Sequence, residues 1–384
     1  MTDPYFHRTV ALRAGGRRLE LATSQELFSS HQVDRGSRLL MRVGAEVLGD
    51  GLIRSTVLDV GCGYGPLGLG LRAMGGARAV LVDRDALAVE YAAANAAANG
   101  LDAVECYGSV GYDDVRGSFD VVVANVPGHA SAGVIGHFVA DAGSVLVRGG
   151  YAAFVVVDPL ADAIESNLAE VVRRVDDRGH TVLVAQFPPA AEDRSSDRDR
   201  YRRGIREFGA HGRTWRVGTA EGVPEFERVS HHTTAVLDYL EAVESGPRVA
   251  VWNPGQGHIP IFLAARQQRS VLQLADRDLL ALRFTDGNLA GNRVRPDPTI
   301  LVHGLQVAAD GGPFDLVVDV LRRSEPPAAA VARIVHARSL LAEGGAVVIS
   351  GPGQSPRRVA AGLEEQGVPV RRKAARRSLV LTVG

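Results

Sequence analysis

Early in the chain stands the stretch Val57-Leu58-Asp59-Val60-Gly61-Cys62-Gly63-Tyr64-Gly65-Pro66-Leu67-Gly68, which joins a short apolar run to a loop with three alternating glycines. A glycine lets the backbone turn tightly and come within contact distance of a ligand. The helical pattern that follows would present unpaired backbone N–H groups to the same ligand. We therefore predict a strand, a loop and a helix that bind a nucleoside-bearing cofactor at Gly61, Gly63 and Gly65.

A carboxylate at the end of the next apolar run supports this prediction. Asp83 follows residues 79–82 and can accept hydrogen bonds from both hydroxyls of a ribose. Residues 63–68 also match the dinucleotide fingerprint Gly-x-Gly-x-x-Gly, a match that is weak on its own. Asp59 separates the two cofactor classes, because its carboxylate suits the cationic amino end of S-adenosylmethionine and would repel a pyrophosphate. Methyl transfer is thus favoured over hydride transfer, and a glycine-rich turn in an ordinary α/β domain is the alternative without a ligand.

The composition limits the class of protein. With 384 residues, 46% of them apolar, the chain can form two domains with complete hydrophobic cores. Its two cysteines, Cys62 and Cys106, are too few for a disulfide framework or a cysteine-built zinc site, which favours a reducing cytoplasm. Neither a secretory leader nor a run long enough to cross a bilayer is visible, so we expect a cytoplasmic protein without membrane contact. His231-His232 lacks partners at ligand spacing, so we expect no metal site.

The net charge of −1 does not itself indicate a nucleic-acid partner, which would need local basic patches. Two patches are present. The first spans residues 194–213 and is interleaved with acidic residues, a pattern that a solvated linker shows equally well. The second is less diluted and consists of Arg357, Arg358, Arg371, Arg372, Lys373, Arg376 and Arg377.

The chain contains an internal duplication. Residues 82–88 reappear as residues 275–281 around the shared Asp-Arg-Asp, and Asn95 and Asn99 correspond to Asn288 and Asn292. Further matches pair residues 61–66 with 255–260, 119–123 with 314–318, 148–150 with 343–345, and 16–28 with 212–226. Each copy alternates short Val/Leu/Ile runs with Ala-rich helical patterns. That alternation predicts an α/β protein with two tandem doubly wound (Rossmann-like) domains, each with a mostly parallel sheet covered by helices.

We expect the first domain at residues 1–187, a charged linker at 188–211 and the second domain at 212–384. The linker begins at Pro188-Pro189 and is dense in charge, so little in it could support a packed element. Residues 171–175 and 181–185 flank a turn-like sequence and predict a hairpin that closes the first sheet.

The second copy is expected to be degenerate. In the sequence match, Asp59 becomes Asn253 and Gly65 becomes Ile259, whose branched side chain would obstruct a ligand. The segment Asn125-x-Pro127 is replaced by residues 320–322. We therefore expect the second copy to have lost cofactor binding. Its role would be to pack on the first copy or to help hold substrate, and packing is favoured.

The segment Asn125-Val126-Pro127-Gly128 follows the apolar strand at residues 120–124. In an open α/β sheet, ligands bind outside the carboxyl ends of the strands, so this segment should face the same crevice as the glycine loop. An asparagine carbonyl and a backbone carbonyl fixed by a proline can accept both hydrogens of a planar amine. They would align the nitrogen lone pair with a sulfonium methyl group, so catalysis could consist mostly of positioning.

The glycine loop followed by Asp83 resembles the class I S-adenosylmethionine-dependent methyltransferases. With Asn125-x-Pro127, and with Glu26–Ser30 and Asp34–Leu40, the chain resembles the "methyltransferase small" family, and above all its tandem-domain bacterial members, which methylate a guanine exocyclic amine in ribosomal RNA. The resemblance implies target-amine contacts at Asn125 and Pro127. It implies cofactor contacts at Asp59, Gly61, Gly63, Gly65, Asp83, Arg84, Ser109 and Asn125.

Three departures from the family pattern bear on the substrate. Val126 replaces the first proline, Gly128 replaces the aromatic ring that would stack on a base, and the intact copy comes first. Our leading hypothesis is a monomeric methyltransferase of a ribosomal RNA base nitrogen, with the guanine exocyclic amine favoured. One alternative is an N- or O-methyltransferase of a small metabolite or a protein side chain. Another is a cofactor-binding RNA scaffold without catalysis.

Overall fold

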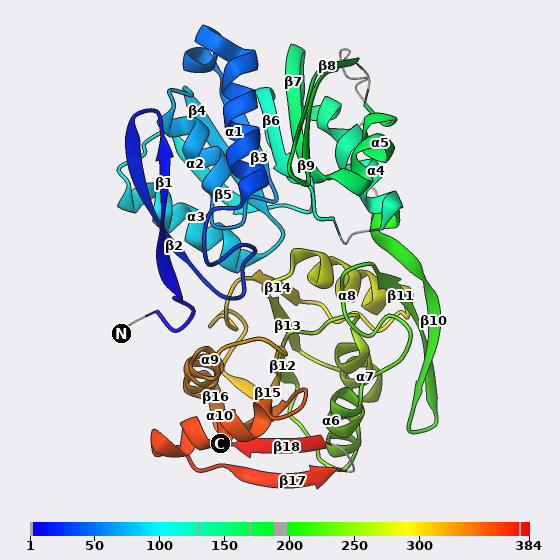
Figure 1. Ribbon diagram of the computed structural model, residues 1–384. Coiled ribbons are helices and arrows are strands. Elements are labelled where there is room, and N and C mark those ends of the chain that lie inside the picture. Colours follow the sequence, from blue (N-terminus) through cyan, green and yellow to red (C-terminus); the bar gives the residue numbers. More distant parts are fainter. Residues whose placement is uncertain (1–2, 129–130, 169, 188–197, 376–377) are drawn as a thin grey trace. The chain divides into compact units, whose positions relative to one another are not determined.

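The computed structural model describes residues 3–128, 131–168, 170–187, 198–375 and 378–384 (Figure 1). They divide into two compact units. The amino-terminal unit comprises Phe6–Arg200, and the carboxy-terminal unit comprises Tyr201–Gly384 together with residues 3–5. None of the helices in the described ranges is long and apolar enough to cross a membrane.

The amino-terminal unit is built on a seven-stranded sheet of order β5-β4-β3-β6-β7-β9-β8. Its strands are β3 Thr56–Val60, β4 Arg78–Asp83, β5 Val104–Gly108, β6 Phe119–Asn125, β7 Leu146–Val157, β8 Glu170–Asp177 and β9 His180–Gln186. Its helices are α1 Arg35–Leu48, α2 Pro66–Ala73, α3 Ala86–Ala98, α4 Ala132–Ala140 and α5 Asp158–Glu165, with 3-10 turns at Gly49–Arg54 and Asp141–Val145. Strands β3 to β7 are parallel, and the predicted hairpin β8–β9 closes the sheet antiparallel.

The carboxy-terminal unit repeats this order as β14-β13-β12-β15-β16-β18-β17. Its strands are β12 Arg248–Trp252, β13 Val271–Asp276, β14 Thr299–His303, β15 Phe314–Val320, β16 Leu341–Ser350, β17 Arg371–Ala375 and β18 Ser378–Val383. Its helices are α6 His231–Glu241, α7 His258–Arg266, α8 Leu279–Gly291, α9 Pro327–Ser339 and α10 Ser355–Glu365. The prediction of two tandem doubly wound α/β domains is therefore confirmed.

The position of each candidate site follows from this strand order. In the first sheet the chain proceeds outward from β3 to β4 and β5, and then returns to the other side of β3 with β6. Such a reversal opens a crevice at the carboxyl ends of the two central strands, where open α/β sheets bind ligands. Strands β3 and β6 are almost entirely buried, because helices cover both faces of a parallel sheet. The loops after β3, β4 and β6 consequently meet at one edge.

A β-hairpin precedes each domain, which is the repeated lead-in noted in the sequence. Strands β1 Arg8–Ala14 and β2 Arg17–Thr23 form the first hairpin, and β10 Arg202–Ala210 and β11 Arg213–Ala220 form the second. Two asparagines of the following long helix hold each hairpin. Asn95 of α3 and its C-cap residue Asn99 exchange hydrogen bonds with the backbone of Ala22 and Glu20. Asn288 of α8 and its C-cap residue Asn292 do the same with Gly218 and Arg216.

The expected linker at 188–211 needs a correction. Residues 188–197 lie outside the described residues, but residues 202–210 form strand β10 rather than a linker. The strand is an exposed ribbon that pairs with β11 and buries mainly Phe208, whose ring stacks on Trp215 at 5.4 Å. A hairpin needs no continuous apolar run, so charge density alone did not exclude a strand. The two units divide between Arg200 and Tyr201, and residues 3–5 belong to the carboxy-terminal unit.

Candidate cofactor and acceptor site

All three alternating glycines of the loop between β3 and α2 have a positive φ. Gly61, Gly63 and Gly65 have φ angles of 73°, 55° and 91°, in the left-handed region that side chains with a Cβ rarely adopt. A Cβ added at Gly61 or Gly63 would meet no atom within 4 Å. These two glycines therefore border open space, where a ligand can approach the backbone.

Asp59 is fully buried directly beneath this loop. Its Oδ2 accepts a hydrogen bond from the Gly68 N–H at 2.8 Å, which ties the strand to the first turn of α2. Its Oδ1 has no hydrogen-bond partner among the described residues. Burial raises the pKa of Asp59 to about 7, against the opposing effect of the Gly68 N–H. A cationic group beside Oδ1 would satisfy this oxygen and favour the ionised carboxylate.

Asp83 lies at the end of β4 and is partly exposed. Its two oxygens accept backbone N–H groups of Gly63 at 3.0 Å and of Asp85 at 2.9 Å. Burial raises its pKa to about 6, although both hydrogen bonds and the neighbouring Arg84 act to lower it. Each carboxylate oxygen retains a further lone pair, so Asp83 can still accept ribose hydroxyls. The structure places Asp83 and Arg84 at the same edge as the glycine loop.

Ser109 follows β5 and is buried. Its Oγ donates to the Gly111 carbonyl at 2.8 Å and accepts from the Asp114 N–H at 3.1 Å, while its own N–H donates to the Asp83 carbonyl. These bonds shape the loop beside Asp83. A cofactor contact of Ser109 remains a prediction, and its backbone is the part that lies nearest to Asp83.

Asn125 ends β6 and is held from one side. Its Nδ2 donates to Asp34 Oδ2 at 3.0 Å and to Ser37 Oγ at 3.1 Å. Both hydrogens of the amide are therefore used, and Oδ1 remains available as an acceptor. This orientation leaves the amide oxygen, Oδ1, as the group that can accept a hydrogen bond from a substrate.

The rest of the acceptor segment is exposed at the same strand end. The Val126 N–H donates to the Val155 carbonyl at 3.0 Å, and the Val126 side chain is buried in the core. Pro127 and Gly128 are exposed. A Cβ at Gly128 would lie 3.3 Å from a methyl group of Val157, so the position of the missing aromatic ring borders β7.

Two residues that sequence reasoning did not assign to the site belong to it. Asp34 caps α1 and binds Asn125, although 91 positions separate them. Tyr64, buried within the glycine loop, donates its hydroxyl hydrogen to the Ser29 carbonyl at 3.3 Å. The segment from Ser29 to Asp34 thus connects the glycine loop with the acceptor segment. Its only sequence signal was the family-like pattern at residues 26–40.

The expected correspondence between the two glycine loops was wrong. The Thr56 N–H donates to Asp120 Oδ2, and the Arg248 N–H donates to Asp315 Oδ2, both at 2.8 Å. This shared contact makes Thr56, the first residue of β3, equivalent to Arg248, the first residue of β12. The resulting equivalences are Asp59 with Val251, Gly61 with Asn253, Gly63 with Gly255, and Gly65 with Gly257.

The second loop therefore has the backbone conformation of the first but different side chains. Asn253, Gly255 and Gly257 have φ angles of 55°, 60° and 95°, close to those of the first loop. Asparagine tolerates a positive φ, which is why the position of Gly61 could change. Ile259 lies inside α7 and does not stand at the third glycine. What the second copy lacks is the carboxylate of Asp59, because Val251 has none.

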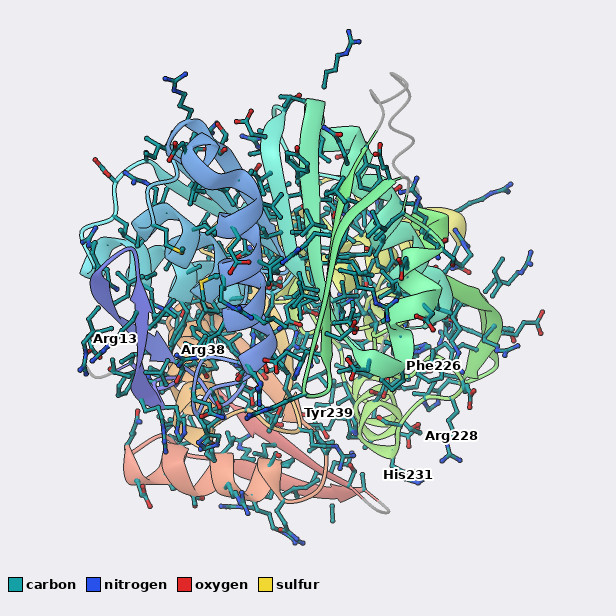
Figure 2. The ribbon with its side chains drawn as sticks, turned by 45° about the horizontal axis from the view of Figure 1, so that its top comes forward. Arg13, Arg38, Phe226, Arg228, His231 and Tyr239 are labelled. Carbon is teal, nitrogen blue, oxygen red and sulfur yellow. The ribbon has the colours of Figure 1, made fainter. Side chains whose placement is uncertain are left out.

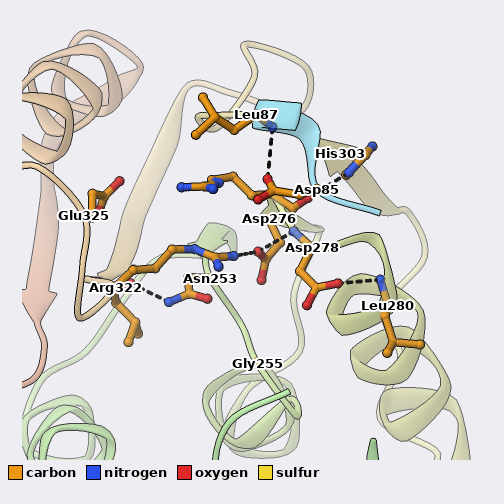
Figure 3. Close-up of polar contacts among 12 residues, drawn as sticks. Asp85, Leu87, Asn253, Gly255, Asp276, Asp278, Leu280, His303, Arg322 and Glu325 are labelled. Atoms are coloured by element: carbon orange, nitrogen blue, oxygen red, sulfur yellow. Dashed lines mark hydrogen bonds and ion pairs between the residues drawn. The ribbon is translucent and has the colours of Figure 1, made fainter. Parts of the chain in front are cut away.

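An arginine closes the equivalent edge of the second sheet (Figure 3). Arg322 forms an ion pair with Asp276, the counterpart of Asp83. The hydrogen bonds Val126 N–H to Val155 O and Leu321 N–H to Ser350 O are equivalent, so Arg322 stands at the position of Pro127. Asn253 Nδ2 donates to the Val320 carbonyl at 2.8 Å. The carboxylate that would receive a ribose is thus already bound by a side chain of the same unit.

A second charged network lies nearby in the carboxy-terminal unit. Buried Arg333 contacts Asp319 at 2.9 and 3.0 Å and also pairs with Glu325. The Tyr5 hydroxyl donates to Glu325 Oε1 at 2.8 Å, and the Tyr5 ring lies 5.6 Å from the Arg277 guanidinium. Polar groups that belong to this unit alone therefore occupy the ends of β13 and β15.

The basic patches are partly neutralised. In the first, Arg203 pairs with Glu227 at 3.1 Å, and its guanidinium lies over the ring of Phe226. Phe226 is labelled in Figure 2. In the second, Arg372 pairs with Glu364 at 2.7 Å, and Arg376 and Arg377 lie outside the described residues. The described residues contain no group of three His, Cys, Asp or Glu side chains that could hold a metal ion.

Comparison with known proteins relates residues 18–183 to the methyltransferase small domain, whose family model they match. Residues of this chain are 35% identical over 175 positions to ribosomal RNA small subunit methyltransferase C of Chromohalobacter salexigens, covering 44% of this chain and 51% of that protein. The ribosomal protein L11 methyltransferase of Thermotoga maritima is 42% identical over 72 residues, which is 19% of this chain and 27% of that protein. The chain thus spans about half the length of the curated relatives it matches, or less.

Among solved structures, the 16S rRNA N2 methyltransferase RsmC of T. thermophilus, in complex with AdoMet and guanosine, is similar over its whole length. The TM-score is 0.65 at 16% identity, and the alignment covers 100% of this chain and 99% of the other. At that identity the similarity establishes the fold, including the tandem arrangement of two domains.

Proposed function

We propose that this chain, in which residues 18–183 form a methyltransferase small domain, transfers a methyl group from S-adenosylmethionine to a base nitrogen of ribosomal RNA. The exocyclic amine of a guanine is the favoured target. The relative of C. salexigens is named as a small subunit ribosomal RNA methyltransferase, and the similar solved structure is that of a 16S rRNA N2 methyltransferase. The amino-terminal unit performs the transfer, as a cytoplasmic monomer.

The orientation of Asn125 carries this proposal. Asp34 and Ser37 take both amide hydrogens, so Asn125 offers its Oδ1 to a substrate. An acceptor selects a group that donates a hydrogen, as an exocyclic amine does, and disfavours a carbonyl or a ring nitrogen without hydrogen. The alignment of the amine lone pair with the sulfonium methyl then supplies the catalysis, since the sulfonium is itself the leaving group.

The cofactor would be held by groups of three neighbouring loops. The unpartnered Oδ1 of Asp59 suits the ammonium group, Asp83 suits the ribose hydroxyls, and the open backbone at Gly61 and Gly63 allows close approach. When bound, S-adenosylmethionine supplies an electrophilic methyl group. Arg84 and Ser109 border this region and complete the proposed binding site.

A second candidate function is methylation of a small molecule. Gly128 stands where related enzymes carry a stacking ring, and base stacking is worth ~1–3 kcal/mol in nucleic-acid complexes. A small amine held by Asn125 alone would not need that ring.

A transfer assay with tritiated-methyl S-adenosylmethionine separates the candidates. Protein-free small-subunit ribosomal RNA, assembled small subunits and a metabolite extract are offered in parallel. We expect label in the RNA, in an N2-methylguanine nucleoside after digestion. Label confined to the metabolite fraction would establish the small-molecule function. Cofactor binding without label in any fraction would favour the cofactor-binding RNA scaffold without catalysis.

A further inference from the structure

We propose that Asp34 is a positioning residue for methyl transfer, because its carboxylate fixes the amide of Asn125 in the orientation that receives the substrate amine. The proposal rests on the function proposed above. Asp34 would touch neither cofactor nor substrate and would act through Asn125.

The contacts of Asp34 show a carboxylate shared between two tasks. Its Oδ2 accepts the Ser37 N–H at 3.1 Å, which caps α1, and the Asn125 Nδ2–H at 3.0 Å. Ser37 Oγ takes the second amide hydrogen at 3.1 Å. Asp34 is partly buried and Ser37 is 3% exposed. Both side chains therefore hold the Asn125 amide from the less exposed side.

The duplicated domain shows that helix capping alone does not require this carboxylate. Ser230 stands before α6 as Asp34 stands before α1, and its hydroxyl accepts the Thr233 N–H at 3.1 Å in the same capping arrangement. The position of Asn125 is occupied there by Val320, which has no amide to orient. Within this molecule, Asp at the cap occurs with Asn at the strand end, and Ser occurs with Val.

The orientation matters because an amide presents opposite groups on its two sides. A carboxylate can only accept hydrogen bonds, so Asp34 determines that Nδ2 faces α1 and Oδ1 faces outward. Without it, rotation about the last side-chain bond would bring Nδ2 toward the substrate. The N–H groups of Asn125 and of the substrate amine would then face each other.

The negative charge also suits the reaction. In the transfer, the amine lone pair forms the new N–C bond, the S–C bond breaks with its electrons on sulfur, and the methylated nitrogen releases one proton to water. Positive charge develops on the nitrogen beside Oδ1 of Asn125. A carboxylate bonded to the other side of the amide polarises Oδ1 toward negative charge, and a preorganised dipole of this kind stabilises the transition state.

Three variants separate positioning from capping. Asp34→Ser supplies the cap found in the second copy but no carboxylate, Asp34→Ala removes both, and Ser230→Ala removes the matched cap in the other unit. The assay uses the full chain with protein-free small-subunit ribosomal RNA. We expect kcat to fall by about 10- to 100-fold in both Asp34 variants, with KM and the cofactor Kd within about twofold of wild type.

Thermal unfolding provides the matched control. Asp34→Ala and Ser230→Ala should each lose about 1 kcal/mol of stability, since each removes a cap, whereas Asp34→Ser should stay near wild type. Ser230→Ala should keep the wild-type kcat. Wild-type kcat in Asp34→Ser would overturn the proposal, as would a loss of kcat that merely follows the loss of stability.

A readout independent of turnover distinguishes failure of this inference from failure of the proposed function. In protein labelled with 15N-asparagine, the side-chain amide signal of Asn125 is assigned by its loss in Asn125→Ala. We expect slow hydrogen exchange for this amide, and a shifted, fast-exchanging signal in Asp34→Ser. An unchanged signal would refute the orienting contact, even if no RNA were methylated by any form of the protein.

Discussion

Asp59 is a buried carboxylate with one oxygen left unpartnered within the described residues, an arrangement that lowers stability in the protein without ligand. Its pKa of about 7 lies above the value of about 3.9 of an unfolded chain. Between those pH values the folded state holds a proton that the unfolded state has released. The free energy of unfolding should therefore fall as pH rises from about 4 to about 7, and the loss should be complete above pH 7.

Asp59→Asn is expected to stabilise the ligand-free protein at high pH. The amide oxygen can still accept the Gly68 N–H, and no charge has to be buried. Melting temperatures of variant and wild type should be similar at pH 4 and should diverge by several degrees at pH 8. A variant that melts below wild type at pH 8 would contradict the raised pKa.

The same exchange should weaken cofactor binding. The ammonium group requires the ionised carboxylate, so wild-type affinity for S-adenosylmethionine should increase as pH rises through about 7, the pKa of Asp59. Calorimetric titration of Asp59→Asn should give weaker binding without this rise. A pH dependence shared by both proteins would assign it to another group.

Asn125→Ala should abolish transfer while largely sparing cofactor affinity. The variant removes the proposed acceptor of the target amine and leaves the proposed cofactor contacts of Asp59 and Asp83 in place. Removing one preorganised hydrogen-bonding group from a reacting centre costs about 10²–10³ in kcat, about 3–4 kcal/mol, so that turnover should fall to the limit of detection. Turnover is measured with the labelled-methyl assay, and unaltered turnover would remove Asn125 from the mechanism.

Sequence reasoning located the proposed ligand-contacting residues better than the residues that support them. Asp59, Asp83 and Asn125 stand directly at strand ends, so the strand pattern alone places them at one edge. Asp34 lies on a helix cap 91 positions from Asn125, and an Asp before a helix is fully explained by capping. The second task of this carboxylate becomes visible only when the two segments are brought together.

An asparagine in the long helix of each domain connects the lead-in hairpin to the glycine loop. Asn95 is 1% exposed and binds the N–H and carbonyl of Ala22 and the carbonyl of Tyr64. Asn288 binds the same backbone groups of Gly218 and the carbonyl of Gln256. Each asparagine thus secures a hairpin and a glycine loop with one side chain.

Alanine at Asn95 or at Asn288 should lower stability by similar amounts, but only one of the two variants should lose cofactor affinity. Asn95→Ala and Asn288→Ala each leave buried backbone groups unpaired, which should cost about 1–3 kcal/mol in its own unit. Cofactor affinity should fall only in Asn95→Ala, because Tyr64 belongs to the intact glycine loop. Thermal unfolding and calorimetry test this pair, and equal loss of cofactor affinity in both would contradict a one-site protein.

The two doubly wound domains were predictable from the duplicated pattern, whereas the local match between the glycine loops was not. Sequence comparison paired glycine with glycine and so shifted the second loop by two residues. The structure pairs Gly61 with Asn253, because asparagine can adopt the positive φ that the turn requires. Strand β10 was missed for a related reason, since a two-stranded ribbon tolerates a charged, exposed sequence.

The chain with both units should bind one equivalent of S-adenosylmethionine. Asp83→Asn should abolish or strongly weaken this binding, whereas Asp276→Asn should leave it unchanged and lower the stability of the carboxy-terminal unit by exposing Arg322 to a neutral partner. Isothermal titration of the wild type and both variants provides the measurement. Two equivalents, or binding lost in Asp276→Asn, would mean that the second unit is not silent.

The preserved φ angles at Asn253, Gly255 and Gly257 mean that the carboxy-terminal unit retains the main-chain conformation of the first glycine loop. The loop differs from the first mainly in its side chains, so substitutions alone could aim to create cofactor binding there. They would place an acid at Val251 and remove Arg322, which now pairs with Asp276. The product would be a chain that binds the methyl donor in both units.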